Sequence, residues 1–213
     1  MISADNFYAL IQLDHFRSPG RPEILAHRAR AAAGLAYCTG LWLPEILALR
    51  RRHWCPDTLP YVVIDGGRVD GQPGSQSHPR AVPVSPAARF LVGQFLASFG
   101  DPIVDLETRF FAIGGAPPLK LEIRNAARRS GIVPEIRPGD LRASFEAFVV
   151  GRNPDDPLAF YLAGRAPAPD MCDVFAEEDP KEKRLVGLLR RCHDVYDEDA
   201  RLWNDRRRLA IAG

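Results

Sequence analysis

The sequence predicts a single α+β domain that is mainly helical and carries a minor sheet. Its 213 residues suit one large domain. The composition, 46% hydrophobic and 26% charged, is ordinary for a chain with a buried core. β-branched segments next to turn residues occur only in the middle of the chain. Apolar residues at helical spacing govern the chain before and after that middle.

Three helices are expected before the sheet. The first is short, is capped by Ser3 or Asp5, and covers about residues 5–11. A second follows the proline- and glycine-rich break at residues 18–22 and spans 23–37, where alanine and leucine recur at helical spacing. Thr39 and Gly40 interrupt the pattern, and Pro44 begins a third short helix over about 45–51.

The minor sheet is expected over residues 61–84. Residues 61–64 (YVVI) form a strand, and the Asp-Gly-Gly run at 65–67 is a hairpin signal. The stretch 68–79 is rich in Gly, Ser and Gln and is interpreted as a loop. Residues 80–84 (RAVPV) form a final strand at the sheet edge, because Pro83 has no N–H to donate to a neighbouring strand.

Helices resume after the sheet. Ser85 begins one that stops near Gly100 and turns an apolar face inward, formed by Phe90, Leu91, Phe95 and Leu96. Further helices are expected over 119–129, over 157–163, and from about Asp140 with inward Leu141, Phe145 and Phe148. Residues 165–170 form a loop. The expected division is one domain over residues 1–180 with a strongly helical tail of the same domain over 181–213.

Composition and charge exclude several classes of protein. No apolar run approaches the roughly 18 residues that a membrane span needs, and the N-terminus lacks a signal-peptide layout, so a cytoplasmic protein is expected. The formal net charge of +1 does not indicate a nucleic-acid partner. Arginine greatly outnumbers lysine, which both phosphate binding and a GC-rich genome would explain. No nucleotide loop or Ser/His/Asp arrangement is visible, and no cofactor is expected.

The cysteines leave one metal-site alternative open. The four cysteines show no C-x-x-C pairing. His53 and Cys55 would supply four ligands together with Cys192 and His193 if the fold joined the two pairs. Buried free thiols are the commoner outcome, and no metal is expected.

Four segments, taken in order, resemble the catalytic domain of the tyrosine recombinases, the family of phage integrases and Xer-type recombinases. Residues 39–50 (TGLWLPEILALR) resemble its T-G-L-R-x-x-E-L-L-x-L segment, and 80–85 (RAVPVS) are similar to its R-x-V-P-L-S stretch. Residues 138–145 (PGDLRASF) are similar to P-H-D-L-R-H-T-F, and 162–165 (LAGR) stand where the family has L-L-G-H. The resemblance covers essentially the whole chain. It implies a small three-stranded antiparallel sheet and a role in DNA recombination or integration.

The same resemblance implies a degenerate active site. In that family a tyrosine hydroxyl attacks a DNA phosphodiester, two arginines hold the phosphate oxygens, and a lysine and a histidine handle the protons. Here Trp42 replaces the first arginine, Gly139 replaces the histidine, and the hairpin at residues 71–78 carries no lysine. Phe175, beside Asp173 and Val174, stands where the nucleophilic tyrosine is expected. The expectation is therefore a protein without catalytic residues, a pseudoenzyme.

The first functional hypothesis is an inactive DNA-binding accessory or regulatory factor of site-specific recombination or integration, with a mobile element as its expected setting. Arg142, which matches the second clamp arginine, would bind phosphate together with Arg165 and Arg80. The alternative for Arg142 is structural, in a pair with a carboxylate such as Asp140 or Asp173. Tyr161 and Tyr196 are the remaining tyrosines considered as substitute nucleophiles.

The second hypothesis is a protein-interaction module that does not contact DNA directly. Family members exchange their C-terminal segment with a neighbouring protomer, and residues 181–213 combine leucines with alternating charge. The tail would bind a recombinase or a second copy of this chain; the alternative is a tail folded back on its own core. Active relatives also carry an N-terminal helical domain that closes around DNA. This chain begins where the catalytic domain would begin, so weaker autonomous DNA binding is expected.

Overall fold

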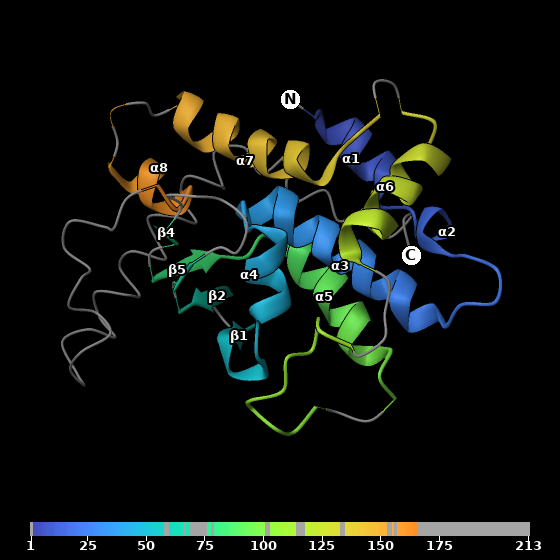
Figure 1. The fold of residues 1–213 in the computed structure, drawn as a ribbon. Helices are drawn as coiled ribbons and strands as arrows, with labels where there is room; N and C mark the ends of the chain where they lie inside the picture. Colours follow the sequence, from blue (N-terminus) through green and yellow to red (C-terminus); the bar gives the residue numbers. More distant parts are fainter. Residues whose placement is uncertain are drawn as a thin grey trace.

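The computed structural model describes residues 2–57, 60–65, 67–68, 76–77, 79–100, 103–113, 118–132, 135–152, 155 and 157–165. These residues form a mainly helical α+β fold in which a small sheet lies at one side of a helical body (Figure 1). The predicted fold class is thus confirmed. Phe175, the expected division at residue 180 and the expected helical tail over 181–213 lie outside the described residues.

The N-terminal segment forms two short helices, α1 (Ala4–Leu10) and α2 (Leu13–Phe16). Of the two predicted caps Ser3 is the one used, because its side-chain oxygen accepts a hydrogen bond from the Asn6 N–H at 3.2 Å. The sequence did not predict α2, which at four residues is too short to show a helical period. Its Leu13 and Phe16 are buried against the helical body.

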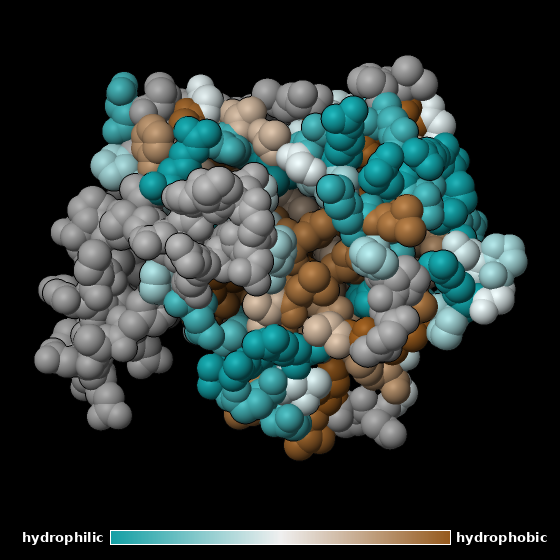
Figure 2. All heavy atoms as spheres, in the orientation of Figure 1, coloured by the Kyte–Doolittle hydropathy of each residue, from teal (hydrophilic) through white to brown (hydrophobic). Residues whose placement is uncertain are grey.

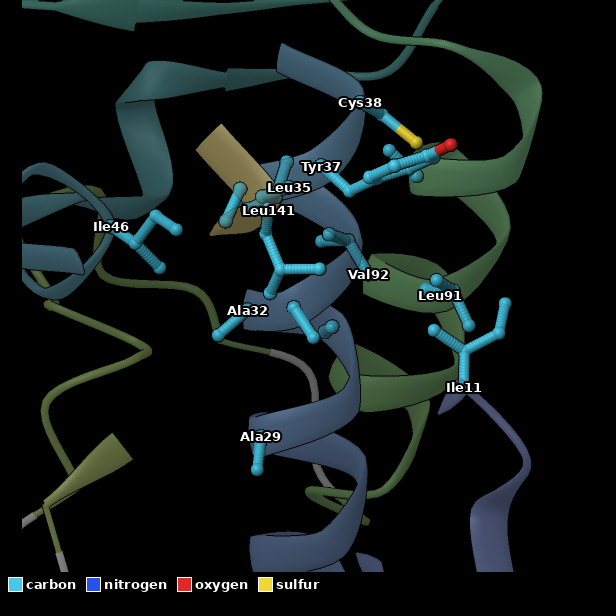
Figure 3. Packing of buried hydrophobic residues seen from close by; sticks show 14 of the residues in the cluster. Ile11, Ala29, Ala32, Leu35, Tyr37, Cys38, Ile46, Leu91, Val92 and Leu141 are labelled. Atoms are coloured by element: carbon cyan, nitrogen blue, oxygen red, sulfur yellow. The ribbon is translucent and has the colours of Figure 1, made fainter. Parts of the chain in front are cut away.

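The centre of the core is α3 (Glu23–Thr39), two residues longer than predicted. It packs against α5 (Pro86–Ala97), α7 (Pro138–Arg152), α2 and α6 (Leu119–Arg129). Figure 3 shows α3 side chains such as Ala32 and Leu35 in the same cluster as Leu91 and Val92 of α5. A Cβ on Gly34 would lie 2.5 Å from Leu91 Cδ1. The glycine therefore allows the close approach of α3 to α5.

After α3 the chain forms α4 (Leu43–Ala48) and a single 3₁₀ turn, η1 (Arg51–His53). The predicted helix over 45–51 is therefore wrong at its C-terminal end. The N–H groups of Arg51 and Arg52 donate to the carbonyls of Thr108 and Leu106, both at 3.0 Å. These long-range bonds replace the bonds that a continued helix would make, and the sequence pattern does not encode them.

The sheet contains β1 (Trp54–Cys55), β2 (Tyr61–Ile64) and β5 (Arg80–Pro83), antiparallel in the order β1-β2-β5. The three-stranded antiparallel sheet implied by the resemblance is confirmed, and β5 lies at the edge as Pro83 predicts. A second pair is formed by β3 (Gly67–Arg68) and β4 (Gln76–Ser77), and apart from Gly67 it lies within the stretch 68–79 interpreted as a loop. That interpretation is wrong for these residues, since backbone pairing alone builds strands of two residues.

The helices after the sheet follow the predicted ranges closely. Ser85 caps α5 by accepting from the Ala88 N–H at 3.2 Å. Leu91 and Phe95 are buried as predicted, but Phe90 is 36% exposed, so its inward placement is wrong. The observed α6 has the predicted bounds, and α8 spans Pro157–Leu162. Leu141 and Phe145 of α7 are fully buried, and Phe148 is partly buried. Among the helices that the structure describes, none is long and apolar enough to cross a membrane.

Candidate functional site

The four segments that resemble the recombinase signatures meet at the C-terminal end of α3. Gly40 ends α3 with φ 66°, and a Cβ there would lie 2.3 Å from Phe145 Cδ1 of α7. Both the backbone conformation and the close approach therefore require glycine. Around this point α4 contributes Glu45, β5 contributes Arg80, and α7 contributes Arg142. We call these residues, with Trp42, Glu146 and Arg165, the arginine cluster.

Arg80 lies inside the cluster as a buried ion pair with Glu45. Its side chain is 1% exposed, and its Nη1 and Nη2 donate to Oε1 and Oε2 of Glu45 at 2.9 and 3.0 Å. Gly164, at the end of α8, packs against the guanidinium, because a Cβ there would lie 2.9 Å from Arg80 Cζ. This burial favours a structural role for Arg80 over the predicted phosphate contact.

Arg142 is also buried, and it joins the ends of two helices. Its Nη1 donates to the carbonyl of Gly40, and its Nη2 donates to the carbonyl of Ala163 at 2.8 Å. Burial lowers the pKa of Arg142 to about 10; the charge of Glu45 opposes this shift, and that of Arg80 adds to it. The bonds that Arg142 makes satisfy carbonyls left free where α3 and α8 stop.

Of the two carboxylates considered on the sequence as partners of Arg142, Asp140 is bonded elsewhere. The Asp140 carboxylate accepts from the backbone N–H of Arg137 at 2.7 Å, within the first turn of α7. Asp173, the other carboxylate considered, lies outside the described residues. Arg142 is therefore held by backbone carbonyls rather than by an aspartate of its own helix.

Trp42 stacks on Arg142. The guanidinium carbon of Arg142 lies 4.1 Å from the centroid of the Trp42 ring, a cation–π contact. The backbone N–H of Trp42 donates to Glu45 Oε2 at 2.8 Å, and this bond holds the first turn of α4. The residue at the position of the first clamp arginine thus contributes a ring that holds the remaining arginine.

Arg165 is the most exposed of the three predicted phosphate ligands. Its side chain is 56% exposed and forms an ion pair with Glu146 of α7. Three arginines and two glutamates leave the cluster with one excess positive charge at neutral pH. Because Arg80 and Arg142 are buried, Arg165 is the group of the three that a ligand in solvent meets first.

The remaining predicted positions contribute little to the cluster. Gly139 lies exposed in the first turn of α7, with nothing within 4 Å of the place a Cβ would occupy. Packing therefore does not require a glycine at this position. Phe175 and the substitute tyrosine Tyr196 lie outside the part of the chain that the structure describes.

Tyr161 of α8 is hydrogen-bonded to strand β5 of the sheet. Its hydroxyl accepts from the Ala81 N–H at 2.7 Å and lies 3.2 Å from the Ala81 carbonyl, to which it donates. The side chain is fully buried. As placed, the hydroxyl does not reach a phosphate in solvent, so the geometry does not favour Tyr161 as a substitute nucleophile.

We expect Tyr161→Phe to lower the free energy of unfolding by about 1–3 kcal/mol, because two buried backbone groups of Ala81 lose their partner. Urea denaturation followed by circular dichroism measures this loss. Phe160→Tyr, on the partly buried neighbouring position, is the control and should change stability by less than about 1 kcal/mol. An unchanged midpoint for Tyr161→Phe would contradict the buried bonds to Ala81.

Sequence reasoning missed Glu45 and Glu146, the carboxylates of the cluster, and the role of Gly164. Their partners lie on other elements far along the chain, so no local pattern pairs them. One usable signal exists: Glu45 follows Trp42 by three residues at a helix start, the spacing of a capping box.

The metal alternative rests on His53 and Cys55. His53 Nδ1 accepts from the Arg50 N–H at 3.2 Å, and its Nε2 lies 3.1 Å from the Asp65 carboxylate. Cys192 and His193 lie beyond residue 165, outside the description. Within the described ranges no three His, Cys, Asp or Glu side chains are grouped to hold a metal ion.

Comparison with known proteins agrees with this fold. No protein-family model and no curated protein matches the sequence. Among solved structures, XerA recombinase is similar with a TM-score of 0.56 and 17% sequence identity, over 89% of this chain and 62% of that chain. This chain thus spans less than two thirds of the recombinase chain it matches. At this identity the likeness shows the fold, which is similar to that of XerA recombinase, and leaves the activity open.

Proposed function

We propose that this chain is a catalytically inactive protein of recombinase fold that binds duplex DNA as an accessory or regulatory factor in recombination or integration. The observation that carries the proposal is the contact between Trp42 and Arg142. A clamp of two arginines would need both guanidinium groups directed at the phosphate oxygens. Here an indole ring stands at one position and stacks on the arginine at the other.

The hydrogen bonds of the cluster support inactivity in the same way. Both terminal nitrogens of Arg142 donate to backbone carbonyls, and those of Arg80 donate to Glu45. A transition-state phosphate would have to displace these buried partners. Removing one oxyanion donor typically costs about 100- to 1,000-fold in rate. The cluster has the geometry of a structural joint between α3, α4, β5, α7 and α8.

A basic surface on α6 supports binding to the DNA backbone. Lys120, Arg124 and Arg128 are four residues apart and therefore lie along one face of the helix; we call them the α6 stripe. All three reach solvent, and Glu135 is paired with Arg124 and Arg128 at 3.7 and 3.2 Å. Hydrophilic side chains gather over α6 and the neighbouring α2 (Figure 2). Lysine and arginine at such spacing suit contacts to successive phosphates.

We expect the protein to bind duplex DNA with a log–log salt slope steeper than about −3. Replacing Lys120, Arg124 and Arg128 together with glutamine should reduce the slope by about 2–3, because each lost phosphate contact releases one counterion fewer. Fluorescence anisotropy on a labelled duplex across a salt series measures the slope.

The matched control is a triple glutamine variant at exposed arginines on other elements, Arg89, Arg109 and Arg137. It removes the same charge from the whole protein and should leave most of the slope in place. Equal losses in the two triple variants would place DNA elsewhere than on α6. An absence of binding at about 50 mM salt would overturn the DNA-binding role altogether.

Catalytic inactivity has a separate test. The protein is incubated with nicked duplexes that trap a covalent 3′-phosphotyrosyl product, and the mixture is resolved on a denaturing gel. We expect no covalent product. A shifted band that disappears after Tyr196→Phe would overturn inactivity and identify the nucleophile.

A further inference from the structure

A cleft separate from the arginine cluster is lined by residues of α2, the start of α3 and α6. These three elements lie together in the fold (Figure 1). Its volume is about 510 Å³, within the range of small-molecule sites. Its lining includes the charged residues Arg17, Arg21, Glu23, Glu122 and Arg129 and the aromatic residue Phe16. None of these residues belongs to the arginine cluster or to the α6 stripe.

Both glutamates of the cleft are already matched by arginines. Glu23 accepts from Arg17, whose Nε lies 3.1 Å from its Oε1. Glu122 is buried and accepts from Arg28 Nη2 at 2.6 Å. Each carboxylate of the cleft therefore has an arginine partner other than Arg21 and Arg129.

Arg21 and Arg129 form no ion pair with a carboxylate among the residues described, although the charge of Arg21 acts to lower the pKa of Glu122. Arg129 donates through Nε to the carbonyl of His15 at 2.5 Å, which holds the side chain over the cleft and leaves its terminal nitrogens for a ligand. Arg21 is exposed and also lines the cleft. Burial lowers the pKa of Arg129, and the charge of Arg21 lowers it further, so the two guanidinium groups repel each other. An anion between them would relieve that repulsion.

Apart from Ser18 and Asn125, the rest of the cleft is apolar. Its wall is completed by Phe16, whose ring is mostly buried, and by Pro19, Pro22, Leu25 and Ala26. A lone inorganic ion would leave this wall in contact with water. The lining therefore suits a molecule with one anionic group and a small apolar or aromatic body.

We propose that this cleft binds a phosphate monoester with a small aromatic body, its phosphate held between Arg21 and Arg129. A dianionic phosphate matches the two positive charges, and its three terminal oxygens can accept from both guanidinium groups at once. The apolar wall covers the body of the ligand. The inference does not depend on DNA binding, because it uses neither the α6 stripe nor the arginine cluster.

Isothermal titration of the full chain with phenyl phosphate tests the proposal. Phenyl phosphate should bind, phenol should not, and inorganic phosphate should bind more weakly than phenyl phosphate. Arg21→Gln should weaken the binding of phenyl phosphate by about tenfold or more, since it removes charge-assisted bonds. Arg89→Gln, on the exposed face of α5, is the matched control and should leave the affinity unchanged.

Three results would overturn the proposal. The first is no binding of phenyl phosphate up to about 5 mM, where even a weak site would be filled. The second is equal affinity in the Arg21→Gln and Arg89→Gln variants, and the third is phenol binding as well as the ester. AMP is titrated alongside: tighter binding of AMP assigns the site to nucleotides and tighter binding of phenyl phosphate to smaller esters, and either ranking supports the monoester site.

Discussion

Arg80→Ala is expected to lower the free energy of unfolding by about 3–5 kcal/mol, because it leaves the Glu45 carboxylate buried without its charge partner. Glu45→Ala should have an effect of the same size, since it leaves the Arg80 guanidinium uncompensated and removes the acceptor of the Trp42 N–H. Urea denaturation followed by circular dichroism measures both. Arg165→Ala, which removes an exposed arginine of the same cluster, should stay within about 1 kcal/mol of the parent.

A double variant separates loss of the pair from loss of packing. Arg80→Met with Glu45→Gln removes both charges and keeps a side-chain oxygen for the Trp42 N–H. We expect it to be more stable than Arg80→Ala, because no buried charge is left unpaired. If the double variant loses the sum of the two single losses instead, Arg80 and Glu45 are energetically independent and the ion pair is not what holds β5 to α4.

Arg142→Ala is expected to cost about 3–4 kcal/mol of unfolding free energy. The carbonyls of Gly40 and Ala163 each lose a charged donor, and the Trp42 ring loses its stacking partner. Arg142→Lys should recover little, since an ammonium has neither the fork to reach two carbonyls nor the plane to stack on an indole. Urea denaturation of both variants gives the comparison, with Arg137→Ala on the exposed start of the same segment as the control.

The same variants decide between the two roles considered for Arg142. A structural role predicts that stability falls while the DNA salt slope of the folded protein stays the same. If Arg142→Lys instead keeps the stability of the parent and loses several-fold in DNA affinity, Arg142 is a phosphate ligand and the proposed structural joint is wrong.

The elements that could be predicted from the sequence are those specified by local signals, namely apolar periodicity, helix caps and proline. In α6 the apolar residues recur at helical spacing between Pro118 and Gly131, and the observed bounds equal the predicted ones. The cap at Ser85 and the edge strand at Pro83 likewise follow from the chemistry of single residues. By contrast β1, β3 and β4 have two residues each, too few for a period, and only pairing with another segment makes them strands.

In the candidate site, too, some features could be predicted from the sequence and others depend on contacts between distant segments. The order of the signature segments was enough to indicate a recombinase-like domain, to mark Trp42 as a position that departs from the family's pattern, and to mark Arg142 as a position that matches it. Whether an arginine faces a ligand or a neighbouring carbonyl is decided by residues distant in sequence. Arg80 is paired with Glu45, 35 residues away, and Arg142 is bonded to Gly40, 102 residues away.

The sequence by itself determined most of the helices that the structure describes, the place of the sheet and the kind of fold, because capping, periodicity and proline geometry act within a few residues. Only the tertiary structure decided which of Arg80, Arg142 and Arg165 are buried and which groups they bond. Burial and hydrogen bonding depend on which segments pack together, and that packing places Arg80 and Arg142 inside the fold and leaves Arg165 in solvent. The cleft between α2, α3 and α6 belongs to the same category, since Arg21 and Arg129 come from segments more than a hundred residues apart.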